Sequence, residues 1–234
     1  MPKRYALYFV PQQKTLLSAL ANGLLGRDIF SNTSVPFHCF KEISQQELEI
    51  ATEEPRKYGL HATLKAPFYL KDNMTEQGLC LALEEFSKKQ SSVYCPKLNL
   101  KNIDNFLGLT PAVLTKSEIN AQEEISCFAF NIVKEFDKFR AELSEADLIR
   151  RKKQLLSLKQ LEYLERFGYP FVADEYRFHL TLTSRILDTE KNKIFFNVFQ
   201  TYLKEVLDQA LFIDNITLCV QSEETDNKFK VHTV

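Results

Sequence analysis

The chain has 234 residues, 44% of them hydrophobic and 26% charged, a composition typical of a globular protein that can bury a sizeable core. Its 30 basic and 31 acidic residues leave a formal net charge of -1, which argues against a long nucleic-acid partner because such a partner needs a dominant positive field. No apolar run approaches membrane-spanning length, and the five scattered cysteines form no C-x-x-C pair, so we expect a soluble cytoplasmic protein with buried, reduced cysteines.

Strands and helices mix along the first half of the chain. Residues 4–10 predict a strand that ends at Pro11, and helical apolar spacing follows over residues 14–26. Ser44 and Glu47 form a capping box for a helix that extends to about residue 52. We further expect an extended segment at 35–40, a strand that begins near residue 58 and stops at Pro67, a helix at 74–90, and strands at 93–103 and 105–113.

The second half begins with a long amphipathic helix, predicted over residues 117–139. Its expected buried side carries Ile119, Ile125, Phe128, Ile132, Val133 and Phe136. We then expect a helix at 145–167, a strand at 176–186, a helix from Asp188 to about residue 208, and a closing strand pair at 210–222 and 228–234. No Pro/Gly/Ser-rich linker divides the chain, so we expect one domain, 1–234, of the α+β class with largely antiparallel sheets and helices on one sheet face.

A histidine-x-threonine pattern occurs in two strand-like stretches. "YGLHATLKAPF" covers residues 58–68 and "YRFHLTLTSRI" covers residues 176–186. Side chains alternate between the two faces of a strand, so His61, Thr63 and Lys65 are predicted to share one face. In the second stretch the shared face carries Arg177, His179, Thr181, Thr183 and Arg185. The opposite faces are apolar and predict contact with a core.

The polar faces predict a groove for an anion. His61 and His179 are 118 residues apart in a chain whose half-length is 117, so each motif could belong to one half of a pseudo-symmetric structure. Two facing halves would place the two imidazoles on opposite sides of one cleft. One imidazole could then take a proton from water while the other protonates the leaving oxygen of a phosphodiester. Thr63 and Thr181 would contact the phosphate oxygens, and Lys65 or Arg177 would add positive charge.

The paired motifs resemble those of the two-histidine (2H) phosphoesterase superfamily, which includes RNA 2',3'-cyclic phosphodiesterases and RNA-end ligase-like proteins. The longer strings "RYALYFVP", "YGLHATLKAPF" and "ERFGYPFVADEYRFHLTL" resemble a bacterial branch of that superfamily linked to phosphonate metabolism. The resemblance implies two lobes with antiparallel sheets facing a central cleft. It also implies His61 and His179 as the catalytic pair and Thr63 and Thr181 as phosphate contacts. Lys65 and Arg177 are not part of the superfamily pattern and rest on strand alternation alone.

Other motifs have simpler interpretations. "VHTV" at residues 231–234 also fits H-x-T but lies at the frayed end of the chain, and His38 is expected to pack in the core. The basic run at residues 149–154 predicts a solvated helix face, or alternatively a fringe of the cleft that steers phosphates. No Walker loop and no metal-ligand spacing occur, so we expect neither a nucleotide triphosphatase nor a bound metal or cofactor.

We therefore expect a monomeric, metal-independent phosphodiesterase that acts on a small cyclic phosphate or nucleotide-like phosphodiester. Two alternatives remain open at this point. A binding module could hold a nucleotide or RNA end without turnover, and a ligase or cyclase could run the same acid–base chemistry towards bond formation. The sequence leaves open which histidine is the base and which the acid.

Overall fold

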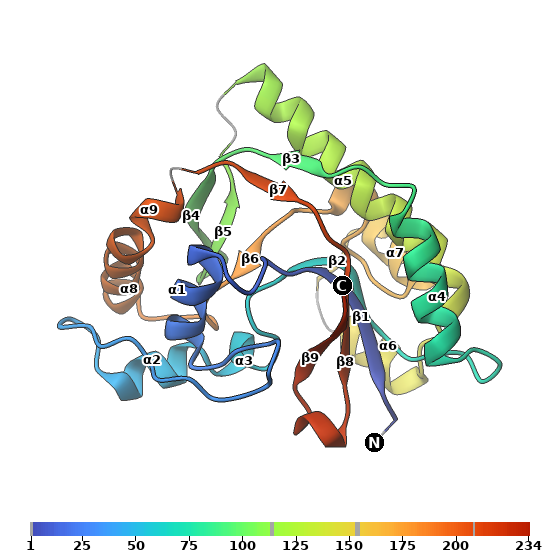
Figure 1. Cartoon of the computed structure of the whole chain (residues 1–234), viewed down its shortest axis with the longest axis horizontal. Helices are drawn as coiled ribbons and strands as arrows, with labels where there is room; N and C mark the ends of the chain where they lie inside the picture. Colours follow the sequence, from blue (N-terminus) through green and yellow to red (C-terminus); the bar gives the residue numbers. More distant parts are fainter. Residues whose placement is uncertain (1, 113–114, 153–154, 208) are drawn as a thin grey trace.

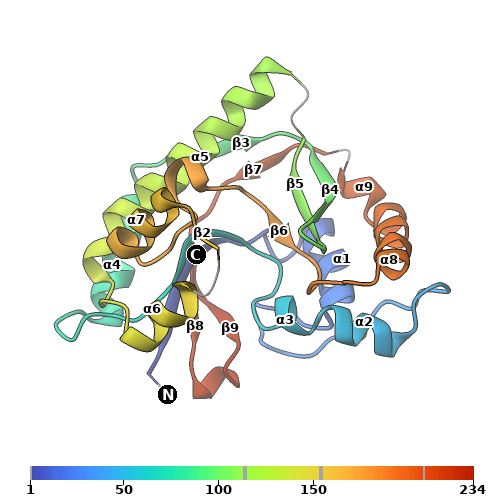
Figure 2. The same ribbon diagram turned by 180° about the vertical axis from the view of Figure 1, so that it is seen from behind.

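The computed structural model describes residues 2–112, 115–152, 155–207 and 209–234. It confirms the predicted α+β class with antiparallel sheets, as Figures 1 and 2 show. The predicted strand end at residue 113, residues 153–154 within the predicted helix 145–167, and the predicted helix end near residue 208 lie outside the described residues. None of the helices in the described ranges combines the length and hydropathy that a membrane span requires.

The largest sheet has four strands in the order β2-β1-β8-β9, and all neighbours are antiparallel. These strands are β1 (Arg4–Phe9), β2 (Ala62–Phe68), β8 (Thr217–Gln221) and β9 (Phe229–Thr233). Side chains of β1 alternate as predicted: Tyr5, Leu7 and Phe9 enter the main core, whereas Ala6 and Tyr8 enter a second apolar cluster on the other face. The predicted closing pair is confirmed for β8 and β9, but the predicted strand over 210–222 is wrong as one element, because residues 211–213 form a separate strand in another sheet.

A three-stranded sheet has the order β4-β5-β6 and carries the second motif. Its strands are β4 (Leu98–Ile103), β5 (Phe106–Pro111) and β6 (Leu180–Thr181). Asp104 and Asn105 have φ angles of 48° and 73°, and this left-handed pair forms the predicted turn between β4 and β5. A small sheet pairs β3 (Val93–Cys95) with β7 (Leu211–Ile213). The predicted strand over 93–103 is wrong as one element, because the chain changes sheets after Cys95, at Pro96.

The helices form two groups on opposite sides of the molecule (Figures 1 and 2). One group contains α1 (Leu16–Leu25), α2 (Gln45–Ala51), α3 (Glu53–Arg56), α8 (Thr189–Tyr202) and α9 (Lys204–Leu207). The other contains α4 (Glu76–Ser87), α5 (Lys116–Phe136), α6 (Glu145–Lys152) and α7 (Leu158–Phe167). The Ser44–Glu47 capping box of α2 is confirmed. The single helix predicted over 145–167 is wrong, because a second capping box between Ser157 and Gln160 starts α7 anew.

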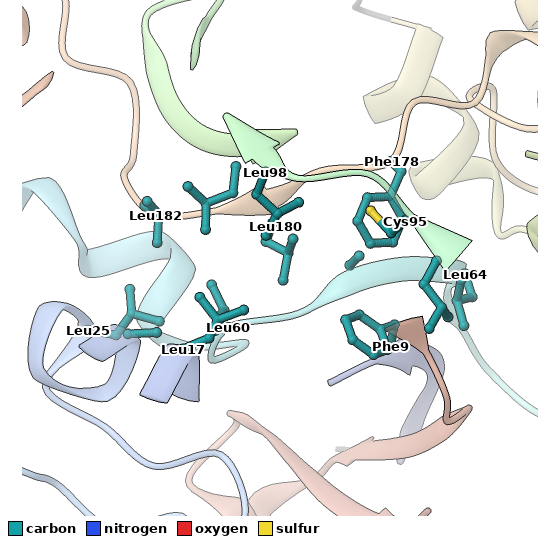
Figure 3. Packing of buried hydrophobic residues seen from close by; sticks show 14 of the residues in the cluster. Phe9, Leu17, Leu25, Leu60, Leu64, Cys95, Leu98, Phe178, Leu180 and Leu182 are labelled. Carbon is teal, nitrogen blue, oxygen red and sulfur yellow. The ribbon is translucent and has the colours of Figure 1, made fainter. Parts of the chain in front are cut away.

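One continuous hydrophobic cluster joins the two larger sheets. Leu60 and Leu64 of the first motif pack with Leu180 and Leu182 of the second, and Phe178 lies near Phe9 (Figure 3). The ring centroids of Phe9 and Phe178 are 6.2 Å apart. The predicted apolar faces of both motifs therefore meet in the same core. Ile119 is an exception to the expected core, since it is 47% exposed.

The second motif forms less strand than the alternation predicts. Only Leu180 and Thr181 pair with β5, instead of the whole stretch 176–186. The backbone of Leu182 and Thr183 still donates to the Leu107 carbonyl, and Ile186 donates to Asn105. The irregular backbone after β6 thus stays attached to β5 and to the turn before it through these hydrogen bonds. Cys39 and Cys127 are exposed, so the expectation of buried cysteines is correct only for Cys95 and Cys219.

Candidate active site

His61 lies at the start of β2 and is held by a carbonyl two residues earlier. Its Nδ1 is 3.0 Å from the Gly59 carbonyl oxygen. A carbonyl only accepts hydrogen bonds, so Nδ1 carries the proton and Nε2 is left to accept one. Gly59 has φ +67°, and a Cβ there would lie 2.6 Å from Cβ of Ile29. Glycine is thus needed in this turn, which orients the imidazole.

His179 repeats this arrangement just before β6. Its Nδ1 is 2.8 Å from the carbonyl oxygen of Arg177, again two residues earlier. The same argument leaves Nε2 of His179 available for proton exchange. Both motifs therefore hold their histidine in the same tautomer, a correspondence that strand alternation alone does not predict.

Aromatic rings surround His61 more closely than His179. The ring of Tyr8 lies 4.0 Å from that of His61, and the ring of Tyr58 lies 5.7 Å from it. Burial lowers the pKa of His61 from 6.5 to about 4; the hydrogen bond to Gly59 opposes this shift, and nearby His179 adds to it. His61 is consequently neutral at pH 7. Around His179, Phe106 is the neighbouring ring, at 5.9 Å.

Both histidines and both threonines line one groove of about 700 Å³, which we call the histidine groove. Thr63 lies opposite Tyr8 in the β1–β2 ladder, and Thr181 lies opposite Gly108 in the β5–β6 ladder. The structure therefore brings together the four predicted residues His61, Thr63, His179 and Thr181. The complete lining is Arg4, Tyr8, Glu54, Pro55, Tyr58, His61, Thr63, Pro67, Phe106, Arg151, His179, Thr181, Thr183, Ser184 and Arg185.

Lys65 is not part of the histidine groove. It is 3% exposed, and its ammonium lies 3.2 Å from Oδ1 of Asp137, after the end of α5. The reason is a bulge in β2: Thr63 pairs with Tyr8 but Lys65 pairs with Leu7, so one extra residue lies between them. Lys65 therefore shares the core-facing side of Leu7, and the predicted common face with Thr63 is wrong.

Arg177 is exposed and does not line the histidine groove; only its carbonyl reaches His179. Irregular backbone before β6 breaks the strand alternation that grouped it with Thr181. Arg185 and Thr183, which the alternation placed on that same face, do line the groove. Of the basic run at 149–154, Arg151 lines the groove. Residues 153–154 of the run lie outside the described part of the chain.

Sequence reasoning missed the contribution of β1. Arg4 and Tyr8 lie on one face of that strand and both line the histidine groove. The alternation in "RYALY" places them together, but nothing local indicates that β1 would pair with β2 and face His179. The lining includes three arginines and one glutamate, so the groove favours anions.

A hydroxyl connects the two motifs across the sheets. Tyr176 Oη donates to the Thr63 carbonyl oxygen at 2.9 Å. β2 is an edge strand of its sheet and β6 belongs to the other sheet, so no strand ladder joins them among the described residues. Tyr176 and the shared core thus fix how the motifs face each other.

The other two histidines lie outside the histidine groove. His232 is on β9, 40% exposed on its side chain, and its Nε2 is 3.8 Å from Glu76. His38 is exposed beside Phe40 and Tyr202, so its predicted core position is wrong. Within the described ranges, no three His, Cys, Asp or Glu side chains come together as metal ligands would.

Comparison with known proteins gives one family and two relatives. A family model described as "Protein of unknown function (DUF1045)" matches residues 63–230. The chain is 33% identical over 193 residues to a protein of Janthinobacterium sp. (strain Marseille) named ribose 1,5-bisphosphate phosphokinase PhnN; the match covers 82% of this chain and 41% of that protein. A Laribacter hongkongensis (strain HLHK9) protein of the same name is 27% identical over 183 residues, covering 78% of this chain and 40% of that one. The chain thus spans about two fifths of the length of these relatives.

Proposed function

For this chain, which belongs to the DUF1045 family of proteins of unknown function, we propose a phosphodiesterase activity on small cyclic phosphates. The observation that carries the proposal is the pair of histidines in one groove, each with Nδ1 hydrogen-bonded to a carbonyl. Each therefore offers Nε2 to a ligand. The resemblance to 2H phosphoesterases, including their two-lobed fold, supports the same conclusion and remains part of the proposal.

The two histidines take different roles in the proposed reaction. His61 is neutral at pH 7 because burial lowers its pKa to about 4, so it serves as the base. Water attacks the phosphorus and gives a proton to Nε2 of His61 as the new P–O bond forms. The ring P–O bond breaks, and the leaving oxygen takes a proton from Nε2 of a protonated His179. The two imidazoles then exchange protons with solvent and return to their starting states.

Thr63 and Thr181 are proposed to donate hydrogen bonds to the non-bridging phosphate oxygens. Each threonine follows its histidine by two residues and lines the same groove. The phosphate would therefore lie between the two motifs, where negative charge increases in the transition state. Arg185 lines the same groove and adds positive charge, a role that the sequence had suggested for Arg177.

The substrate class is proposed from the groove and the relatives together. A groove of about 700 Å³ suits a small molecule. The named relatives act, by their names, on ribose 1,5-bisphosphate, which favours a ribose phosphate and a role in phosphonate metabolism. This chain has no G-x-x-x-x-G-K-[ST] loop and matches only part of those proteins, so we propose no kinase activity for it.

A turnover assay in EDTA tests the proposal. Purified protein is given 2',3'-cyclic, 3',5'-cyclic and ribose 1,2-cyclic phosphates, and ring opening is followed by phosphorus NMR. We expect turnover that His61→Ala and His179→Ala each reduce by at least about 100-fold. His232→Ala is the matched control, since it removes a histidine of an H-x-T sequence that lies outside the histidine groove.

The alternatives give different results in the same assay. If no cyclic phosphate is opened but one of them raises the melting temperature, the chain is a binding module and the phosphodiesterase proposal is wrong. If a cyclic phosphate is instead opened by the hydroxyl of a second molecule, so that the two are joined, or if such a joined phosphodiester closes to a ring with loss of that alcohol, the chemistry runs as a ligase or cyclase. Loss of activity in His232→Ala equal to that in His61→Ala would also contradict the proposed site.

A further inference from the structure

Arg4 is a cation of the histidine groove that neither motif supplies. It lies on β1 on the same face as Tyr8, and Tyr8 is directly opposite Thr63. Arg4 and Tyr8 are four positions apart, so their Cα atoms are about 13 Å apart along the strand. Arg4 therefore lies beyond the reacting phosphate, towards the end of the groove where Pro67 and Arg151 also contribute to the lining. These three residues also border a small neighbouring cavity of about 70 Å³.

Other arginines of the fold that are buried or partly buried use their donors within the protein. Arg27 donates to carbonyls of Arg56, Lys57 and Phe229 and to the side chain of Asn32. Arg56 donates to Leu25, Glu49 and Thr52. Arg140 forms an ion pair with Asp137. In each case a guanidinium removed from water is matched by several acceptors, as its desolvation requires.

Arg4 is also partly buried, but fewer hydrogen bonds within the protein replace the water that its guanidinium loses. Among the described residues, its side chain makes one hydrogen bond, from Nη1 to Oε1 of Gln221 at 3.0 Å. Its guanidinium lies 5.9 Å from the ring of Tyr69 and 5.8 Å from that of Phe229. Within the described ranges of the chain, no carboxylate pairs with it. These contacts orient the guanidinium but leave most of its five N–H donors available to a ligand.

We propose that Arg4 forms an anion subsite at this end of the histidine groove and binds a second phosphoryl group of the substrate. This inference rests on the proposed function, since the first phosphate is the one between the two motifs. A guanidinium binds a phosphoryl group through paired N–H···O contacts, and the Arg4 side chain is already oriented by Gln221 and two rings. Arg151 adds a second positive charge at the same end. The preferred substrate is therefore a small cyclic phosphate that also carries a phosphomonoester.

Paired substrates test this subsite. The better of the 2',3'-cyclic and ribose 1,2-cyclic phosphates of the turnover panel, both of which have a free O5, is compared with the same compound phosphorylated at ribose C5. We expect kcat/KM to be at least roughly tenfold higher for the phosphorylated compound, as a charge-assisted contact would give. Arg4→Met should reduce that ratio to within about threefold of one. The ratio is measured within each variant, so a general loss of folding or activity cancels.

Arg166→Met is the matched control, because Arg166 is exposed on α7 and outside the groove lining. It should keep the ratio of the parent protein. Equal kcat/KM for the two compounds in the parent, or an unchanged ratio in Arg4→Met, would overturn the subsite while leaving the phosphodiesterase proposal intact.

If no cyclic phosphate is turned over, binding is measured instead. The affinities of adenosine 2',3'-cyclic phosphate with and without a 5'-phosphate are compared by calorimetry. Tighter binding of the phosphorylated compound that is lost in Arg4→Met would support the subsite even though the phosphodiesterase proposal had failed. Equal binding of both compounds would overturn the subsite as well.

Discussion

The hydrogen bond from Nδ1 of His61 to Gly59 decides which nitrogen of that ring can accept a proton. A neutral imidazole bound in this way has its lone pair on Nε2. Burial keeps the ring neutral over most of the pH range, because it lowers the pKa of His61 to about 4. At the scale of single residues, the site therefore has a base whose identity and tautomer both follow from its position.

This pKa predicts the acid side of the pH–rate profile. The base must be unprotonated, so kcat/KM should stay high down to about pH 5 and fall only near the pKa of about 4, instead of near 6.5. The His61 ring proton signals should titrate at the same pH by NMR, with His38→Ala and His232→Ala used for assignment. A His61 titration above about pH 6 would contradict the assignment of His61 as the buried base.

Protonation of His61 also affects folding. The unfolded chain takes up this proton near pH 6.5, whereas the folded chain resists it until about pH 4. The free energy of unfolding is therefore expected to fall as the pH drops between these two values. The pH–rate profile should be measured with the melting temperature followed in parallel.

At the scale of elements, Tyr176 joins β2 to the segment before β6. Tyr176→Phe removes the hydroxyl that donates to the Thr63 carbonyl, so the free energy of unfolding should fall by about 0.5–1.5 kcal/mol. Without this hydrogen bond the relative position of the two motifs is less well fixed, so kcat should fall while KM changes little. Tyr163→Phe is the control, since it removes the hydroxyl of Tyr163 that bonds Asp174, away from the groove. Unchanged kcat in Tyr176→Phe would show that the core alone aligns the motifs.

A second element-scale prediction concerns Lys65 and α5. Asp137→Ala leaves the buried Lys65 ammonium without its carboxylate, so it should lower the free energy of unfolding by roughly 3 kcal/mol in chemical denaturation. Replacing Lys65 by Met in the same protein should recover only part of that loss, because the buried ammonium is then removed while Arg140 still lacks its carboxylate. If the double variant is no more stable than Asp137→Ala, the ion pair is not what stabilises the contact between β2 and α5.

These elements also show what the sequence can and cannot predict. Alternation placed His61 with Thr63 and His179 with Thr181, because those short stretches keep the period of an extended strand. It failed for Lys65, since the bulge depends on how β2 pairs with β1 and has no local signal. It failed for Arg177 because the strand begins only at Leu180. Arg4 was missed because its role depends on pairing between distant strands.

At the scale of the whole molecule, the two larger sheets share one hydrophobic cluster, and Leu180 is fully buried in it (Figure 3). Leu180→Ala should lower the free energy of unfolding by about 2–5 kcal/mol, measured by denaturant titration. Leu187→Ala is the control, since that side chain is 77% exposed, and it should change stability by less than about 0.5 kcal/mol.

Because we propose that residues 1–234 form one domain, fluorescence and circular dichroism should report one coincident transition. Two separate transitions would contradict that proposal.

The order of strands in the four-stranded sheet has a consequence for biosynthesis. β1 lies inside this sheet, between β2 and β8, and its Arg4 bonds a residue 217 positions later in the chain. A ribosome releases β1 and β2 long before β8 and β9 exist. Until then β1 has an unpaired edge, a feature that invites association with other chains. We therefore expect the sheet that carries His61 to close only after β9 has left the ribosome, and the nascent chain to depend on chaperones during that interval.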